Sequence, residues 1–541
     1  MTHGTGGSLA AQTLDGTPFM AFLVIVCLSV LLYLLYGADA EGTADVYVAR
    51  RSQGPVANAF ALAGDHISVV TLLSVTGLVA LDAYDGMALA VCAIVALGVL
   101  LVLAQPLHHL RRYTLGDTLG ARFPGGAARI AGTVATLSFC LPLTVVQLVV
   151  AGAAVTQLLG LSDVGPAAQV CTAFIGAIMI CAAALSGMRG NSVLQAIKTV
   201  ILLLAMTVLA GQVLDEFGWS PNRLLDAAAR NSVGPADYYE GGVLTGDGPT
   251  AALSRLSTQI TVVLGAGVAP HLLMRVNAAD RGSSARRTVG YAIGLVTAFS
   301  GLAVLLGLGA SGLVGAKTLL APDPEGQAAL PLLALRLAHE GSGGGIIMAL
   351  TVSMVFLTGL TVVAALTLTS AASLAHDVFA RTTRGSRGGT TEIGAMRWSA
   401  TVVGALAVTL AIILQGKNFD FLGQFAVTVA AATVLPALVL ELFWSGYTRA
   451  GMLWTVYGGL GCCVLLQLFG PAVSGAPHSV LSDVDFAWFP LASTGLVSVP
   501  VGFLLGWAAS RMTASGSAVR SAHTEWEEMA LTGTDASDRP R

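Results

Sequence analysis

Thirteen long apolar segments follow one another along this chain of 541 residues, and they constrain its fold more than any other feature. Hydrophobic residues make up 55% of the chain and charged residues only 11%. A bilayer core about 30 Å thick requires about 20 apolar residues per helix, whereas a soluble protein could not bury this much apolar surface. The sequence therefore predicts an all-α integral membrane protein with 13 transmembrane helices. We expect the spans at 18–37, 56–81, 86–106, 127–160, 166–187, 192–216, 252–274, 288–314, 343–376, 396–415, 422–444, 449–470 and 488–511.

The connecting loops alternate in their content of Lys and Arg. One set is rich in Arg and includes the loops around Arg50 and Arg111 and the C-terminal tail. The opposite loops hold only Arg223, Arg230, Lys317, Arg336 and Lys417, with Arg255 at a helix end. Because cytoplasmic loops carry the excess of positive charge, we predict a bacterial-type plasma-membrane protein with its N-terminus outside and its C-terminus cytoplasmic.

The sequence lacks the motifs of several other classes of membrane protein. No phosphate-binding loop and no soluble domain that could hold a nucleotide are present, which argues against an ATP-driven pump. No HExxH motif or Cys/His cluster indicates a metal site, and the spans contain almost no paired titratable groups. We therefore expect no enzyme, no organic cofactor, no nucleic-acid partner and no catalytic residue. Thirteen spans in one chain favour a secondary transporter in the lipid bilayer.

Two of the expected helices are interrupted. The second span contains Gly64-Asp65-His66, and the seventh contains Gly265, Gly267 and a proline. Transporters bind their cargo where paired helices break near the membrane midplane. The second and seventh spans each open a five-helix unit, and because five is odd the two units would be inverted in the membrane. This predicts the 5+5 inverted-repeat core of the leucine-transporter type.

This pattern predicts how the chain is organised. We expect an extracellular N-terminus (1–17), an extra first helix and loop (18–55), a first inverted repeat of spans two to six (56–216), an extracellular loop (217–251), a second inverted repeat of spans seven to eleven (252–444), two further helices (445–511) and a disordered cytoplasmic tail (512–541).

Oxygen-rich and ionisable side chains near the breaks are candidates for the coupling site. An acid within a membrane span is a functional candidate by default, so Asp65 and the adjacent His66 are proton-coupling candidates, although both could instead form a static pair that anchors the helix. In the ninth span Thr358 and Thr361 share a face, and their hydroxyls could help bind a hard cation. Threonines of this kind can also simply bond to their own helix.

Several motifs together resemble the sodium:solute symporter family, and within it the cation/acetate (monocarboxylate) symporters. These motifs are Ala63-Gly64-Asp65, Leu110-Arg111-Arg112-Tyr113, Pro270-His271-Leu272-Leu273-Met274-Arg275 and Ala375-His376-Asp377, within a match from about residue 18 to 511. The resemblance implies a leucine-transporter-type core and a cation site formed by backbone carbonyls of Gly64, Ile67 and Thr358 and by the hydroxyl of Thr361. The family's second adjacent hydroxyl is Val362 in this chain, so sodium and a proton both remain open as the coupling ion.

The resemblance also implies a substrate pocket beside this cation site. The candidate substrate-binding residues are Ser68, Thr71, Gln147, Gly265, Ala266 and Gly267. We expect no Lys or Arg at the midplane, so a substrate carboxylate would be held by helix N-termini, hydroxyls and the nearby cation. This suits a small monocarboxylate such as acetate, propionate or pyruvate.

Two other functions remain open at this point. The same fold could carry another small solute such as proline or choline with sodium, and a membrane sensor or scaffold is an alternative of a different class. The preferred solute, the stoichiometry and the oligomeric state do not follow from the sequence.

Overall fold

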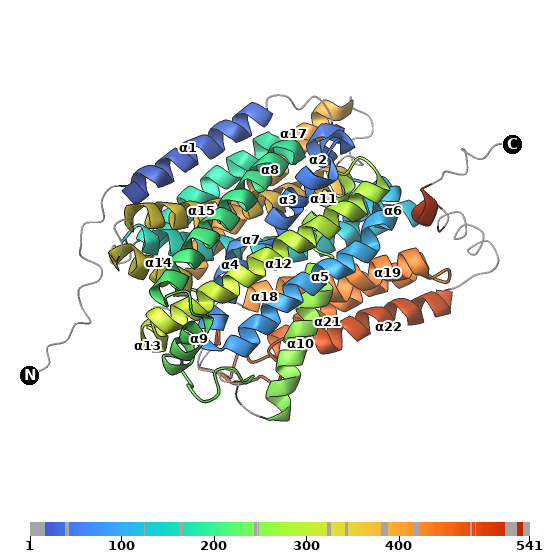
Figure 1. Cartoon of the computed structure of the whole chain (residues 1–541). Helices are drawn as coiled ribbons and strands as arrows, with labels where there is room; N and C mark the ends of the chain where they lie inside the picture. Colours follow the sequence, from blue (N-terminus) through green and yellow to red (C-terminus); the bar gives the residue numbers. More distant parts are fainter. Residues whose placement is uncertain are drawn as a thin grey trace, which may run out of the picture.

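The computed structural model describes residues 17–37, 43–123, 125–161, 166–242, 246, 248–321, 326–340, 344–379, 388–415, 421–475, 479–481, 483–513, 527 and 529–533. This part of the chain is helical, and its only extended pairings are two isolated bridges, Gln53 with Ala279 and Ser474 with Leu481. The all-α prediction is therefore confirmed. Figure 1 shows long helices running side by side across the molecule.

Eleven described helices are long and apolar enough to cross a membrane, and a bent pair makes twelve if it counts as one span. The elements that make up these spans are the bent pair α3 (Pro55–His66) and α4 (Val69–Leu81), then α5 (Ala83–His109), α7 (Gly126–Leu158), the two halves of α8 (Ala167–Glu216), α10 (Pro249–Ala266) with α11 (Pro270–Asn277), α12 (Gly282–Leu313), α15 (Gly344–Ser373) with η2 (Leu374–Phe379), α17 (Gly388–Leu414), α18 (Phe421–Val429) with η3 (Ala430–Val434) and α19 (Leu435–Phe443), α20 (Arg449–Leu453) with η4 (Trp454–Gly458) and α21 (Gly459–Leu468), and α22 (Gly495–Thr513).

The first expected span corresponds to α1 (Thr17–Gly37), which is not among the eleven. The total of thirteen thus stays a prediction, as does the inverted repeat. The molecule is nevertheless a multi-pass membrane protein. The remaining short helices are α2 (Thr43–Val48), η1 (Ala49–Arg51), α6 (Leu115–Arg122), α9 (Pro221–Arg230), α13 (Ala316–Leu320) and α14 (Ala329–Glu340).

Helix α15 lies at the centre of the bundle. Every residue from Thr351 to Ser373 is buried, and the helix packs against α7, α8, α1 and α17. A helix that is apolar on all sides is one that neighbours enclose completely. The hydroxyl-rich ninth span of the sequence is therefore an interior helix of the protein.

Both interrupted spans are broken where the sequence predicts. Helices α3 and α4 meet at 63° around Ile67 and Ser68. Helices α10 and α11 are separated by Gly267–Ala269, and Pro270 begins the second of them. Each break leaves carbonyl groups at one helix end and N–H groups at the next without partners within a helix, and such groups are available to a ligand or to side chains.

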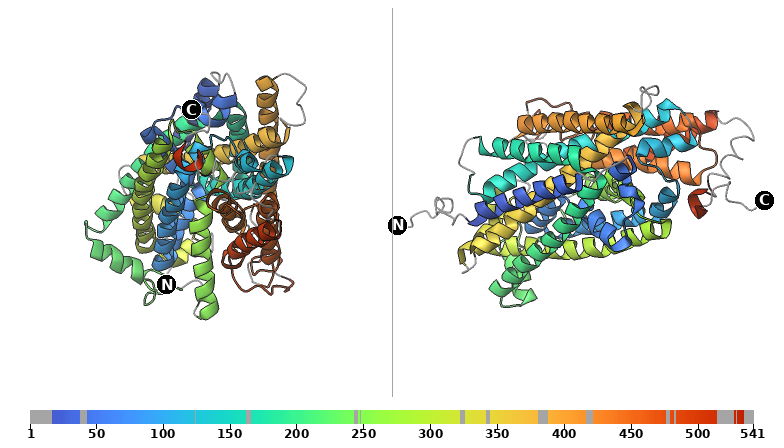
Figure 2. Two further views of the ribbon diagram at one scale, coloured as in Figure 1. Left: turned by 90° about the vertical axis from the view of Figure 1, so that its right-hand side faces the viewer. Right: turned by 90° about the horizontal axis from the view of Figure 1, so that it is seen from above.

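The short elements gather at two opposite ends of the bundle. Helices α9 and α13 lie near the start of α1, whereas α6 lies at the other end (Figures 1 and 2). The dark red segment 529–533 lies at the same end as α6, where His109 Nδ1 is 2.9 Å from the carbonyl oxygen of Ala530 and Ala530 is buried. This part of the predicted disordered tail is packed against the end of α5, because Met529 and Ala530 supply apolar contacts.

Candidate functional site

The first group of the site is the end of α3. This helix stops at His66 because Ile67 has extended backbone angles (φ −82°, ψ 98°), and Ile67 N–H makes the last helical bond, to Ala63 O. The carbonyls of Gly64 and Ile67 are consequently free of helical partners and lie at the negative end of the helix dipole. Two such oxygens attract a cation, as the sequence analysis expected of these residues.

A cation of the protein itself occupies this position. The Nζ atom of Lys198, on α8, donates to Gly64 O at 2.6 Å and to Ile67 O at 2.5 Å. The Lys198 side chain is buried, with only 1% of its surface exposed. We expect no Lys or Arg at the midplane, where the breaks and the substrate site are predicted, and the position of Lys198 at the α3 break shows that this expectation is wrong. Lys198 reaches the break through the packing of α8 against α3, and the sequence does not reveal this packing because the two helices are far apart along the chain.

The threonines of α15 are buried and satisfied by their own helix. Thr358 Oγ1 donates to Met354 O at 2.7 Å, and Thr361 Oγ1 donates to Leu357 O at 2.8 Å. Bonding to the carbonyl one turn back is the ordinary way in which threonine is accommodated inside a helix. The hydroxyl protons are thus used, although the lone pairs of the oxygens are not, and the side chain of Val362 carries no oxygen.

Asp65 belongs to a buried ion pair. Its Oδ2 accepts a hydrogen bond from Arg275 Nε at 2.7 Å, with Nη2 of the same guanidinium at 2.6 Å, and its Oδ1 accepts from Gln195 Nε2 at 2.5 Å. Arg275 also donates to Ser192 Oγ. Both charged side chains are almost completely enclosed. A buried carboxylate is retained as a charge when it is paired and hydrogen-bonded in this way.

His66 does not face Asp65. Its Nε2 lies 3.0 Å from the carbonyl oxygen of Ala93 on α5. The two adjacent residues, which the sequence suggests as a proton-coupling site, thus have different partners on different helices. The geometry of Asp65 fits the anchoring alternative, whose partner is Arg275 rather than His66.

Three candidate substrate residues meet at the start of α4. Ser68 caps this helix: its Oγ accepts from Thr71 N–H at 3.0 Å and lies 3.0 Å from Thr71 Oγ1. From α7, Gln147 Oε1 accepts from Val70 N–H at 3.4 Å. Gln147 is completely buried, yet its Nε2 donor has no hydrogen-bond partner. An unpaired buried donor beside a helix N-terminus favours an anion.

The candidates on α10 serve close packing. A Cβ atom on Gly265 would lie 2.1 Å from the carbonyl oxygen of Val427, and one on Gly267 would lie 2.1 Å from that of Ala96. These glycines allow α10 to approach α18 and α5, and Ala266 between them is partly exposed. Their contacts are directed to α18 and α5, whereas Ser68 and Thr71 bond to each other and Gln147 accepts from Val70 N–H between them.

A second polar region lies at the α6 end of the bundle. Thr114 Oγ1 donates to Asp377, with distances of 2.9 and 2.8 Å to Oδ1 and Oδ2, and it accepts from Asp117 N–H at 2.9 Å. Asp117 also pairs with Arg129 at 2.8 Å. Burial alone would raise the pKa of Asp117, but the hydrogen bond and charge of His376 and the nearby arginines outweigh it, so this pKa lies below its usual value.

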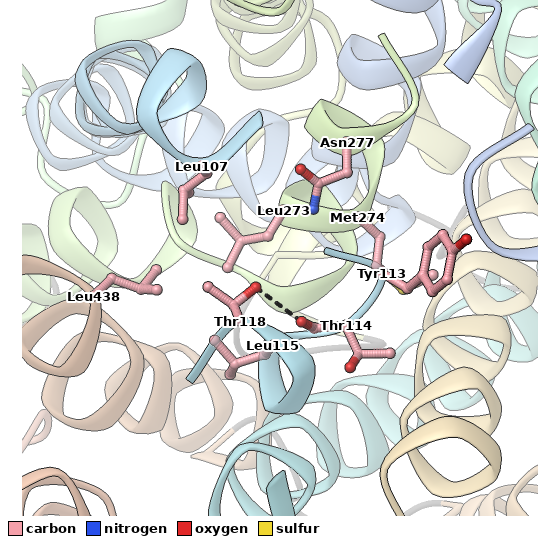
Figure 3. Close-up of a pocket in the computed structure, with 9 residues that line it drawn as sticks. All are labelled: Leu107, Tyr113, Thr114, Leu115, Thr118, Leu273, Met274, Asn277 and Leu438. Atoms are coloured by element: carbon pink, nitrogen blue, oxygen red, sulfur yellow. Dashed lines mark hydrogen bonds between the residues drawn. The ribbon is translucent and has the colours of Figure 1, made fainter. Parts of the chain in front are cut away.

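A small hollow adjoins this region. It is lined by Leu107, Tyr113, Thr114, Leu115, Thr118, Leu273, Met274, Asn277 and Leu438 (Figure 3). Thr118 Oγ1 donates to Thr114 O at 2.9 Å within it, and the Asn277 side chain brings a buried oxygen without a partner. The hollow lies between α5, α6, α11 and α19.

Sequence reasoning missed the polar face of α8. Ser192, Gln195 and Lys198 follow each other at three-residue spacing and so share one side of the helix. All three contact α3 or its ion pair. A lysine surrounded by Ala, Ile, Val and Leu within an expected span was the available signal, because intramembrane ionisable residues are rare and functional.

Comparison with known proteins agrees with this architecture. The model of the sodium:solute symporter family matches residues 46–459. The chain is 32% identical to a monocarboxylic acid transporter of Corynebacterium glutamicum, covering 91% of each protein, and 31% identical to the uncharacterized symporter YwcA of Bacillus subtilis, covering 96% of this chain and 98% of that protein.

Solved structures agree in fold. A Na⁺-coupled sialic acid symporter in a substrate-bound outward-open state superposes with a TM-score of 0.71 at 15% identity, covering 93% of this chain and 99% of that one. The transporter MhsT in complex with L-phenylalanine gives a TM-score of 0.54 at 13% identity, covering 84% of this chain and 98% of that one. These neighbours are transporters of the leucine-transporter fold. The chain belongs to the sodium:solute symporter family.

Proposed function

We propose that this protein takes up a small monocarboxylate, such as acetate, propionate or pyruvate, together with a cation, sodium or a proton, by alternating access. The observation that carries the proposal is the buried Gln147 Nε2 donor without a partner beside the N-terminal end of α4. The similarity to a monocarboxylic acid transporter supports this class of substrate.

The local geometry suits a carboxylate. The N-terminal end of α4 carries a partial positive charge, and Ser68 and Thr71 add hydroxyl groups at the same place. The leucines and valines of α4 make the surrounding wall apolar. A short carboxylic acid has one charged end and one small apolar end, so it matches both parts of this environment.

The two broken helices provide the moving parts. In alternating access the site at the breaks is exposed first to one side and then to the other as the two groups of helices rock. We propose that the α9–α13 end, which includes the expected extracellular loop 217–251, faces outside, and that the hollow beside α6 faces the cytoplasm. The distribution of Arg residues supports this orientation.

The test is uptake of radiolabelled acetate and pyruvate by proteoliposomes, driven by a sodium gradient and separately by a proton gradient. Empty liposomes correct for passive entry of the weak acids. Uptake of either acid above that background, inhibited by unlabelled propionate, is the expected result. Uptake of proline or choline instead, or of none of these solutes, would contradict the monocarboxylate assignment.

A Gln147→Leu variant tests the site itself. Losing one buried donor to a charged ligand costs about 1.5–3 kcal/mol, so KM for acetate should rise about tenfold or more while the fold is retained. Gln212→Leu, at an exposed position of α8, is the matched control and should leave KM unchanged. Equal KM values for the two variants would remove Gln147 from the site.

A further inference from the structure

The carbonyl pair at the end of α3 is the natural place for a coupling cation in this fold. Any ion that bonded to both Gly64 O and Ile67 O would have to lie between the two oxygens. The Nζ atom of Lys198 already lies there, at 2.6 and 2.5 Å from them. A metal ion and this ammonium would therefore occupy the same space.

Neighbouring contacts hold the Lys198 side chain in this position. One turn before it, Gln195 donates to Asp65 at 2.5 Å. Directly after it, Thr199 Oγ1 donates to Phe60 O at 2.9 Å. The absence of a side chain at Gly64 lets α8 come this close, because a Cβ there would lie 2.7 Å from both Gln195 Oε1 and Thr199 Oγ1.

The charges around Lys198 also favour a resident cation. From α3, Asp65 attracts the ammonium and His66 is the other titratable group that interacts with it. From α11, Arg275 pairs with Asp65 and His271 lies near His66. Lys198 and Arg275 already supply two basic groups against the one carboxylate of Asp65, and a further cation would be repelled strongly in a low-dielectric interior.

We propose that the Lys198 ammonium is the permanent cation of the α3 break, in place of sodium, and that the protein works without Na⁺ at this position. The oxygen donors implied by the family resemblance do not fit a sodium ion in this chain. Lys198 already uses the carbonyls of Gly64 and Ile67, and of the family's two adjacent side-chain hydroxyls only that of Thr361 is present, because residue 362 is a valine.

The binding test needs no substrate, so it is independent of the proposed function. The melting temperature of the purified full chain in detergent is measured in sodium chloride and in choline chloride of equal concentration. The wild type should melt at the same temperature in both salts. A sodium-specific rise that Thr361→Ala abolishes would show an ion at these ligands and would overturn the proposal.

Lys198 variants provide the complementary arm. Lys198→Met keeps the length of the side chain but leaves two buried carbonyls without a donor, so its melting temperature in choline should fall and sodium should partly restore it. The matched control is Lys317→Met, at an exposed position on α13, which should behave like the wild type. If Lys198→Met melted like the wild type in both salts, Lys198 would not hold the break.

The transport arm rests on the proposed function. Wild-type uptake of acetate should be equal in external sodium and in external choline. In choline, uptake by Lys198→Met should be slower than wild-type uptake by about tenfold or more, which corresponds to the free-energy cost of one unsatisfied buried acceptor. A strict sodium requirement of wild-type uptake would overturn the inference. No uptake of any monocarboxylate, with the melting results as expected, would count against the proposed substrate only.

Discussion

Arg275 and Asp65 join the two broken helices directly: Nε of the arginine on α11 donates to Oδ2 of the aspartate on α3 at 2.7 Å. Both side chains are buried, and Gln195 and Ser192 of α8 complete their hydrogen bonds. The helices at the two breaks, α3 and α11, are thus connected through one ion pair, and α8 contacts both of its members.

Removing one partner of this pair should destabilise the protein severely. Arg275→Ala leaves a buried carboxylate without its counter-charge, which costs about 3–5 kcal/mol. The melting temperature of the purified protein measures this, with Arg223→Ala at an exposed position of α9 as control. A double variant, Asp65→Leu with Arg275→Met, should melt higher than Arg275→Ala, and a double variant that melts lower would argue that the pair itself is not the cause.

Gly64→Ala should separate α8 from α3. Its Cβ would approach the backbone oxygen of Gln195 to 2.8 Å, and a backbone atom cannot turn away. We expect a loss of about 1–3 kcal/mol together with weaker contacts of Lys198, as in other overpacked cores. Gly98→Ala on α5 is the control, because nothing lies within 4 Å of its added Cβ. Thermal unfolding of both variants measures this loss. Equal stability of the two variants would contradict the close approach of α8 to α3 at Gly64.

The Tyr238 hydroxyl should keep the expected outer loop closed over α4. It donates to Val79 O at 2.6 Å, and the side chain is buried. Tyr238→Phe should cost about 1 kcal/mol and speed proteolysis within residues 231–242, whereas Tyr239→Phe, whose tyrosine is exposed, should have little effect. Similar cleavage rates in the two variants would speak against this contact.

The same contact has a defined pH dependence. Burial raises the pKa of Tyr238 above its ordinary value near 10. A group whose pKa is raised by folding contributes stability that is complete below its unfolded value and is lost as the pH rises through its folded value. Protection of the loop should therefore be constant up to about pH 10 and decline only above it. Loss of protection between pH 7 and 9 would point to another group.

Thr114 should stabilise the α6 end of the bundle through two roles. It caps α6 and donates to the carboxylate of Asp377. Thr114→Val removes both interactions and should cost about 2 kcal/mol, whereas Thr114→Ser keeps the hydroxyl and should be nearly neutral. Chemical or thermal unfolding of the two variants distinguishes them, and a serine variant as unstable as the valine variant would mean that the methyl group matters instead.

The sequence predicted the broken helices because their causes are local. Gly267 and Pro270 interrupt the seventh span within a few residues, and the second span breaks at Ile67 and Ser68, directly after the Gly64-Asp65-His66 segment that marks the place in the sequence. Glycine, proline or a charged residue within an apolar span affects one or two helical turns, so such a break can be predicted without knowing which helices pack against it. The contact between Ser68 and Thr71 can be predicted in the same way, because the two residues are only three positions apart in the sequence.

The contacts between distant helices could not be read in the same way. Lys198 is 134 residues from Gly64 and Arg275 is 210 residues from Asp65, and nothing local directs either side chain to its partner. The same limit explains His66, which is adjacent to Asp65 in sequence but packs against α5. An ionisable residue in a span signals that a partner exists, but only the packing of the helices identifies it.

The covalent attachment of Lys198 to α8 has an electrical consequence. A bound ion leaves with the substrate and carries its charge across the membrane, whereas a tethered ammonium neutralises the site and stays behind. The inward movement of an unaccompanied carboxylate is opposed by about 2.3 kcal/mol per 100 mV of inside-negative potential. Accumulation of the acid would therefore draw on a proton that binds elsewhere on the chain, or on exchange for an outgoing anion, and current recordings during uptake would reveal which charge moves.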